Sequence, residues 1–309
     1  MKKIAFATYP KAPNLTADDA LAIAPLKQFN IDVTPAIWND PNVNWKQFDA
    51  VIVRSCWDYH RQPRPFRQWL DQLQAQQVTL WNPAEIIRWN MHKKYLQELA
   101  AKGVVIPPTI WLEAESSANL FSLLNENRFA QAVIKPMISA TAHQTYRTAP
   151  ATARADQARL DEILRYSGAM IQKFVDEITT TGEWSLIFFA GKFSHAVLKR
   201  APAGDFRVQS DFGGTYHQHL PPPELIKQAE AILHLIEQPL LYARVDGVDR
   251  NGQLVLMELE LIEPCLFLNV DAAAPRRLAE AIQLFLRQSK CNPKNLPTDE
   301  KRPTDKKLF

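Results

Sequence analysis

Residues 242–261 hold the most informative pattern in the sequence: Tyr242-Ala243-Arg244-Val245-Asp246-Gly247-Val248, then Asp249-Arg250-Asn251-Gly252, then Gln253-Leu254-Val255-Leu256-Met257-Glu258-Leu259-Glu260-Leu261. Two apolar runs on either side of an Asn-Gly turn predict a β-hairpin. Residues two apart on a strand share a face, so we expect Arg244 beside Asp246 and Glu258 beside Glu260. Three carboxylates on adjacent strands form a hard-oxygen set of the kind that binds Mg²⁺. The same pattern also fits a solvated sheet face on which Arg244 forms a structural salt bridge.

The first 82 residues alternate short apolar runs with stretches of helical spacing. Strands are expected at 3–8, 31–35, 50–54 and 78–81, and helices at 16–29 and 63–77. This alternation predicts a small doubly wound α/β domain over residues 1–82. Ligands of such sheets bind beyond the carboxyl ends of the strands, where Arg54, Trp57 and Asp58 follow the third run. These residues form either a wall of a substrate site or the packing at a domain interface.

The rest of the chain is expected to form two further domains and a tail. The second domain covers residues 83–169, with Lys93 on a helix over 83–102 and Lys135 at the end of a strand over 132–135. The third covers residues 170–288 and has mostly antiparallel strands. Residues 289–309, rich in proline and charge, are expected to be a disordered tail. The expected fold class is therefore α/β with α+β parts.

Glycine content and charge exclude two common classes of protein. The chain has 309 residues but only nine glycines, all between Gly103 and Gly252, so its first hundred residues cannot hold a G-x-G-x-x-G dinucleotide turn. A G-x-x-x-x-G-K-[ST] phosphate loop is also absent from the sequence. The tail over 290–309 has six Lys or Arg against three Asp or Glu, which accounts for the whole net charge of +3. The remaining body is neutral, so a nucleic-acid partner is not expected.

Cysteine content and hydropathy bear on the compartment. Three widely scattered cysteines read as free thiols, and the apolar runs are too short to cross a membrane. A cytoplasmic protein without a membrane partner is expected.

A glycine-rich loop is the remaining segment that points to chemistry. It reads Gly204-Asp205-Phe206-Arg207 and is followed by Gly213-Gly214. In a chain so poor in glycine, this clustering beside an arginine suggests a mobile loop that closes over an anion. An ordinary surface loop would explain the same residues, and Lys93 and Lys135 taken alone are also compatible with surface lysines.

Several of these segments, in this order, resemble the ATP-grasp superfamily from residue 1 to about 288. Gly204-Asp205-Phe206-Arg207 with Gly213-Gly214 is similar to the G-D-F-R-x-N-x-x-x-G-G segment of the ribosomal-protein glutamate ligase and bacterial glutathione synthetase, with Gln209 in place of Asn. Arg244-Val245-Asp246 followed by Glu258-x-Glu260 resembles the R-V-D…E-x-N pattern of D-alanine–D-alanine ligase, with Glu260 at the Asn position. Three further segments are most similar in sequence to a glutathione-synthetase-like group that includes the D-cycloserine-forming cyclo-ligase. They are Arg54…Trp57-Asp58-Tyr59, Lys135-Pro136…Ser139-Ala140 and Gly182-Glu183-Trp184-Ser185.

The resemblance implies a fold in which an N-terminal α/β domain precedes two α+β subdomains that clamp ATP. It also implies roles for individual residues. The ATP phosphates would contact Lys93, Lys135, Lys199 and Arg207. The adenine would contact Gln172, Lys173 and Val175, and the ribose would contact Glu183. Mg²⁺ would bind Asp246, Glu258 and Glu260. Arg207 and Arg244 would stabilise the acyl phosphate and the oxyanion. The substrate would contact Arg54, Trp57, Asp58 and Ser139.

The resulting hypothesis is an ATP-dependent ligase that joins a carboxylate to an amine through an acyl phosphate and releases ADP and phosphate. The expected substrates are small molecules, an amino acid or a small peptide-like compound. A cyclo-ligase that closes a ring within one substrate stays open, as does a nucleotide or amino-acid sensor that binds without turnover. A homodimer is also left open.

Overall fold

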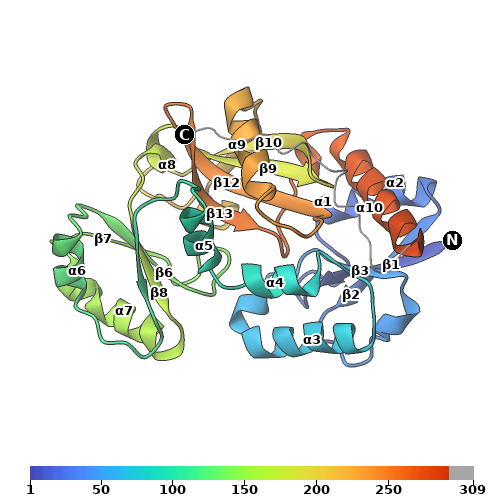
Figure 1. Ribbon diagram of the computed structural model, residues 1–309, viewed down its shortest axis with the longest axis horizontal. Helices are drawn as coiled ribbons and strands as arrows, with labels where there is room; N and C mark the ends of the chain where they lie inside the picture. Colours follow the sequence, from blue (N-terminus) through green and yellow to red (C-terminus); the bar gives the residue numbers. More distant parts are fainter. Residues whose placement is uncertain (292–309) are drawn as a thin grey trace, which may run out of the picture.

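The first of three β-sheets is parallel and lies near the N-terminus (Figure 1). The computed structural model describes residues 1–291. Strands β1 (Lys2–Thr8), β2 (Ile31–Ile37), β3 (Ala50–Val53) and β4 (Leu80–Trp81) take the order β2-β1-β3-β4. Alternate residues of β1 and β3 pack on opposite sides, one set against α2 (Ile23–Gln28) and the other against α3 (Pro63–Ala75). The doubly wound α/β arrangement predicted for this region is confirmed.

Helices of the N-terminal half are shorter than predicted. The expected helix over 16–29 is two helices, α1 (Ala17–Ala20) and α2. Thr16 caps α1 as expected, because its side chain accepts a hydrogen bond from the Asp19 N–H. Single 3₁₀ turns follow at Trp45–Gln47 and Tyr59–Arg61.

The second sheet is antiparallel and has the order β5-β8-β6-β7. Its strands are β5 (Thr109–Leu112), β6 (Ala132–Pro136), β7 (Tyr146–Thr148) and β8 (Ala169–Lys173). Helices α6 (Leu120–Glu126) and α7 (Ala153–Tyr166) cover one face of it. Strand β8 carries this sheet past the expected domain limit at residue 169.

The third sheet is also antiparallel and contains the hairpin predicted from the sequence. It has the order β11-β10-β9-β12-β13, with β9 (Glu183–Phe189), β10 (Lys192–Arg200), β11 (Thr215–Gln218), β12 (Tyr242–Arg250) and β13 (Gln253–Glu260). Helix α9 (Pro223–Leu233) packs on one face, and α8 (Glu177–Thr180) lies beside β12. Strand β11 was not predicted. A 3₁₀ turn at Ser210–Phe212 precedes it, and another occupies Leu268–Val270.

Two helical regions connect the sheets. The expected helix over 83–102 is broken into α4 (Ala84–Asn90) and α5 (Tyr95–Ala101). Helix α10 (Ala274–Cys291) contributes Leu278 and Ile282 to a core that also holds Ile4 of β1 and Ile187 of β9. It thus fixes the third sheet to the first. It also extends past residue 289, where the tail was expected to begin, and the rest of that tail lies outside the described residues.

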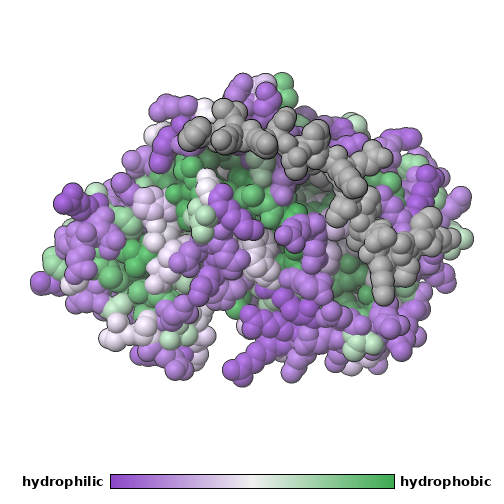
Figure 2. Space-filling view, in the orientation of Figure 1, coloured by the Kyte–Doolittle hydropathy of each residue, from purple (hydrophilic) through white to green (hydrophobic). Residues whose placement is uncertain are grey.

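The space-filling view shows two lobes separated by a notch at the lower edge (Figure 2). The lobe of α6 and α7 lies on one side of the notch and that of α3 on the other (Figure 1). Among residues 1–291, no helix has the length and apolar character needed to cross a lipid bilayer.

Candidate active site

One cavity of about 340 Å³ collects most of the residues singled out from the sequence. The second and third sheets contribute to it, together with the segment that follows β3 and the glycine-rich loop. The predicted site residues that line it are Trp57, Lys93, Lys135, Ser139, Glu183, Lys199, Arg207, Arg244, Asp246, Glu258 and Glu260. Because these residues come from positions as far apart as 57 and 260, the fold alone brings them together.

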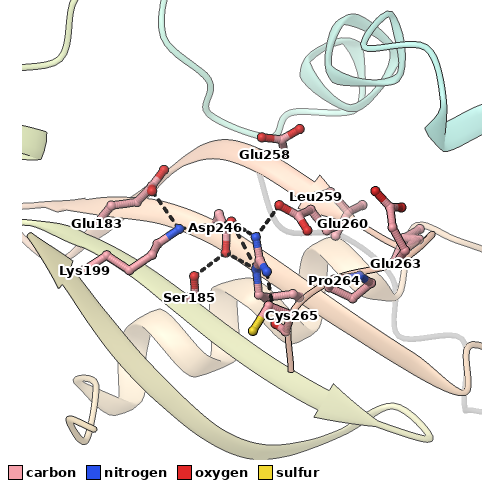
Figure 3. Close-up of polar contacts among 12 residues, drawn as sticks. Glu183, Ser185, Lys199, Asp246, Glu258, Leu259, Glu260, Glu263, Pro264 and Cys265 are labelled. Atoms are coloured by element: carbon pink, nitrogen blue, oxygen red, sulfur yellow. Dashed lines mark hydrogen bonds and ion pairs between the residues drawn. The ribbon is translucent and has the colours of Figure 1, made fainter. Parts of the chain in front are cut away.

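The floor of the cavity is the hairpin of β12 and β13. In the register of this pair, Arg244 lies opposite Glu260 and Asp246 opposite Glu258. The Arg244 guanidinium donates to both Asp246 carboxylate oxygens at 2.8–3.2 Å and also pairs with Glu260 (Figure 3). Arg244 is only 7% exposed. Arg244 therefore forms the structural salt bridge that the sequence left open as an alternative. It nevertheless lines the cavity.

Neighbouring strands complete this charge network. Lys199 of β10 lies 2.8 Å from Glu183 and 3.2 Å from Asp246, and the Ser185 hydroxyl donates to Asp246 at 2.6 Å. Burial raises the pKa of the Asp246 carboxyl, but Arg244 and Lys199 outweigh it and bring the pKa down to about 2. Burial also opposes the charge on Lys199, whereas Asp246 and Glu183 raise its pKa. Asp246 is therefore an ionised carboxylate at neutral pH.

Glu260 behaves differently from Asp246 although both contact Arg244. Burial raises its pKa to about 7, with Asp246 and Glu258 adding to the rise and Arg244 opposing it. Burial, which is the largest cause, thus outweighs the stabilising charge of Arg244 at Glu260.

The donor set suits a hard cation, because it consists of carboxylate oxygens on paired strands. Within residues 1–291, no three acidic, histidine or cysteine side chains converge closely enough to hold a metal ion as they stand. Glu258 pairs with Lys93 and Glu260 with Arg244. The residues therefore fit Mg²⁺ if these two glutamates exchange a cationic partner for the metal.

Two lysines reach the cavity from elements outside the third sheet. The break between α4 and α5 places Lys93 outside any helix, contrary to the prediction, and its backbone N–H donates to the Met137 carbonyl at 2.8 Å. Its side chain reaches Glu258. Lys135, at the end of β6, donates to Gln172 at 3.1 Å, and burial together with Lys93 lowers the pKa of its amine. Two cations thus lie where an anionic ligand would be stabilised.

The glycine-rich loop places Arg207 at the mouth of the cavity. Its guanidinium pairs with Asp205 at 2.6 Å and stacks on the Phe212 ring, with 3.8 Å to the ring centroid. A Cβ at Gly214 would collide with the Val208 carbonyl, so this turn requires glycine. Arg207 is half-buried and can turn toward an anion only by leaving Asp205.

Five predicted residues do not line this cavity. Arg54 is 1% exposed and donates to Asp19 at 2.8 Å, so the expected substrate contact is corrected to a structural ion pair. Asp58 lines a neighbouring cavity and accepts a hydrogen bond from Trp38 at 2.8 Å. The three residues expected around adenine lie just beyond the wall: Gln172 is buried behind Lys135, Lys173 is exposed, and Val175 packs with Met257.

Comparisons with known proteins agree with this arrangement. Residues 4–82 match the family described as the D-cycloserine synthetase DcsG N-terminal domain. The cycloserine biosynthesis protein DcsG of Streptomyces lavendulae is 28% identical over 263 residues, which cover 79% of this chain and 86% of the relative. The crystal structure of D-cycloserine synthetase DcsG has a TM-score of 0.83 at 26% identity, covering 92% of this chain and 99% of that one.

More distant structures share the fold at lower identity. D-alanine–D-alanine ligase from Bacillus anthracis has a TM-score of 0.67 at 16% identity and covers 94% of this chain and all of its own. A RimK domain ATP-grasp protein from Sphaerobacter thermophilus has the same score at 14% identity, covering 91% of this chain and 99% of its own. This chain has the fold of the ATP-grasp ligases. The predicted fold is confirmed, and the relatives support the predicted class, an ATP-dependent ligase.

The same cavity also includes an anchored segment, residues 261–267, in which no site residue was assigned from the sequence. Each of its seven consecutive backbone carbonyls lies within hydrogen-bond distance of a side-chain donor group, although the Tyr242 hydroxyl also reaches the Val53 carbonyl and His195 serves two carbonyls with one ring nitrogen. In chain order the donors are Asn82, Tyr242, Trp57, Arg54, Arg244 and, for the last two carbonyls, His195, at 2.8–3.2 Å. Glu263 and Phe267 of this segment line the cavity. The one available signal was a third acid, in the pattern Glu258-x-Glu260-x-x-Glu263-Pro264.

Proposed function

We propose that this chain is an ATP-dependent ligase that joins a small carboxylate to an amine, with an amino acid or a small peptide-like molecule as substrate. One observation carries the proposal. A single cavity of an ATP-grasp fold holds lysines and an arginine suited to phosphates, opposite three carboxylates suited to Mg²⁺. Among the structural relatives, D-alanine–D-alanine ligase from Bacillus anthracis is known in complex with ATP.

The reaction proceeds in two steps. A substrate carboxylate oxygen attacks the γ-phosphorus of ATP, the bond to the ADP oxygen breaks, and an acyl phosphate forms. The amine then attacks the acyl carbon, the carbon–oxygen bond to phosphate breaks, and the nitrogen gives up its proton. Such a reaction depends on positioning and on charge neutralisation, and it requires no nucleophilic side chain.

The chain's own residues divide this work. Lys93, Lys135 and Lys199 neutralise phosphate oxygens, and Arg207 joins them after leaving Asp205. Mg²⁺, held by Asp246, Glu258 and Glu260, supplies further charge neutralisation at the phosphates when bound. Arg244 stabilises the oxyanion that develops at the acyl carbon.

The remaining site residues bind the nucleoside part of ATP and the substrate. Glu183 accepts hydrogen bonds from the ribose, and the segment of Gln172, Lys173 and Val175 holds adenine between the second and third sheets. Trp57 and Ser139 border the substrate, and Asp58 borders the neighbouring cavity of about 660 Å³.

A cyclo-ligase of the D-cycloserine-forming type is the second candidate. The specific observation in its favour is the likeness to D-cycloserine synthetase DcsG over 92% of this chain, with a TM-score well above that of D-alanine–D-alanine ligase. Such an enzyme performs the same activation, after which an amine of the same molecule attacks the acyl phosphate.

One experiment separates these activities. The purified chain is incubated with Mg²⁺-ATP and a panel of amino acids and amino-acid derivatives, singly and in pairs, while ADP and phosphate are measured and products are weighed by mass spectrometry. A ligase gives a product that contains two substrates less one water, whereas a cyclo-ligase gives one substrate less one water. ATP binding without substrate-dependent ADP formation across the panel would instead indicate a sensor and refute both.

We also place the protein in the cytoplasm, where Cys56 and Cys265 stay reduced. A homodimer is proposed as the assembly. Light scattering of the purified chain tests the dimer, and fractionation of cells tests the location.

A further inference from the structure

Glu263 is a cavity carboxyl group with no cationic partner. Its side chain is 9% exposed and lines the cavity. The four carboxylates that the third sheet contributes each meet a lysine or an arginine, namely Glu183, Asp246, Glu258 and Glu260. Among residues 1–288, whose side chains are described, none forms a hydrogen bond or ion pair with the Glu263 carboxyl, and no dashed line reaches it in Figure 3.

The backbone around Glu263 is held in place. The Trp57 indole donates to the Glu263 carbonyl at 3.1 Å, and Arg54 donates to the Pro264 carbonyl at 2.8 Å. On the other side, the Tyr242 hydroxyl lies between two carbonyls, 2.8 Å from that of Ile262 and 2.6 Å from that of Val53. The carboxyl group therefore projects into the cavity from an anchored segment, as a preorganised binding group does.

The electrostatics of Glu263 favour an incoming cation. Burial raises its pKa well above the usual range, the nearby Glu260 and Glu258 raise it further, and Arg244 and Arg54 oppose the rise. A buried acid without a partner is costly, and a bound cation relieves that cost. The titratable groups that face it are Cys56, Tyr59, Tyr242, Glu258, Glu260, Arg54 and Arg244.

We propose that Glu263 binds the cationic amino group of the substrate, which is therefore an amino-acid-like molecule. Trp57 and Tyr59 line the same part of the cavity, and aromatic rings stabilise an organic ammonium group. Asp246 lies opposite Glu258 on paired strands and Glu260 follows two residues later on the same strand, whereas Glu263 lies beyond them on the anchored segment, so it is assigned to the substrate and not to the metal. This inference deepens the proposed function and rests on it.

The test measures binding and needs no turnover. Calorimetry with ADP and Mg²⁺ present compares D-alanine with D-lactate and D-serine with D-glycerate, and it includes D-cycloserine as an amino probe. These pairs differ only in an amine or a hydroxyl group. We expect at least one amino probe to bind the wild-type chain tenfold or more tightly than its hydroxy counterpart, the scale of one charge-assisted hydrogen bond. Glu263→Gln should lose that preference, and Glu113→Gln, at an exposed acid outside the cavity, should keep it.

Two further readouts separate this role from others. Because the acid lacks a partner, Glu263→Gln should leave the melting temperature at pH 8 equal or higher, whereas a structural residue would lower it. Amine binding should also release a proton in the wild-type chain only, seen as a dependence of the binding enthalpy on the buffer.

Several results would overturn the inference: an unchanged preference in Glu263→Gln, no amine preference in the wild-type chain, a lower melting temperature, or a loss of Mg²⁺ affinity while the preference persists. A Glu263-dependent preference in a chain that never forms ADP would instead uphold this site and refute the proposed function.

Discussion

Replacement of Arg244 by methionine should destabilise the protein as well as impair turnover. The guanidinium is 7% exposed and holds Asp246, Glu260 and the Cys265 carbonyl. Removing one partner of a buried ion pair costs about 3–5 kcal/mol. We expect the lower end, about 3 kcal/mol, because Asp246 keeps Lys199 and Ser185, and Glu260 can take up a proton near pH 7. At roughly 2–4 °C per kcal/mol, the melting temperature should fall by about 6–12 °C.

Arg250→Met is the matched control for this experiment. Arg250 ends the same strand, and its pair with Glu177 leaves the arginine side chain 43% exposed, so its loss should cost less than about 1 kcal/mol. The assay combines thermal unfolding, ATP calorimetry and turnover below the melting temperature of the variant. Arg244→Met should keep ATP affinity within about threefold and lose turnover by about a hundredfold. A melting temperature equal to that of Arg250→Met would refute the buried-pair reasoning, and unchanged turnover would refute the catalytic role.

Three other predictions address the nucleotide, the metal and pH. Lys135→Ala should weaken ATP binding by about 1.5–3 kcal/mol in calorimetry, whereas Lys192→Ala, an exposed lysine of β10, should leave it unchanged. Glu258→Gln should abolish Mg²⁺-dependent turnover while circular dichroism stays native; near-normal turnover would exclude Glu258 from the metal site. The native pKa of Glu260, about 7, lies above its usual value of 4.5, so its stabilising effect is complete below pH 4.5 and is lost as pH rises through 7. Urea unfolding should therefore show that the free energy of unfolding of the wild-type chain falls between pH 5 and 8. In Glu260→Gln this fall should be smaller by up to about 3 kcal/mol. Parallel plots of stability against pH for the two chains would contradict this pKa.

The sequence predicted the buried strands well and the interruptions of helices poorly. Val51, Ile52 and Val53 are fully buried, and such runs identify strands without knowledge of the fold. The helical pattern of 83–102 continues through Lys93, and the break becomes visible only with the Met137 carbonyl that binds the Lys93 N–H. Strand β11 was missed because its four residues are polar and lie at a sheet edge.

The candidate site divides in the same way. Asp246, Glu258 and Lys199 could be identified because their spacing and residue types match known motifs. The fold then brings these three residues to one cavity. Arg54 was misassigned since its partner, Asp19, lies 35 residues away, and nothing local signals a buried ion pair. No role could be assigned to Glu263 from the sequence, because an acid before a proline resembles any surface turn until its burial is known.

The anchored segment makes the N-terminal domain a poor candidate for modular exchange. Arg54 and Trp57 belong to that domain, yet they hold the carbonyls of Pro264 and Glu263 more than 200 positions later in the chain. A chimera that grafts residues 1–82 from a relative without an arginine and a tryptophan at these places would strand two buried acceptors, at about 1–3 kcal/mol each. Shuffling or directed evolution of substrate range in this scaffold should therefore transplant residues 1–82 and 261–267 as one unit.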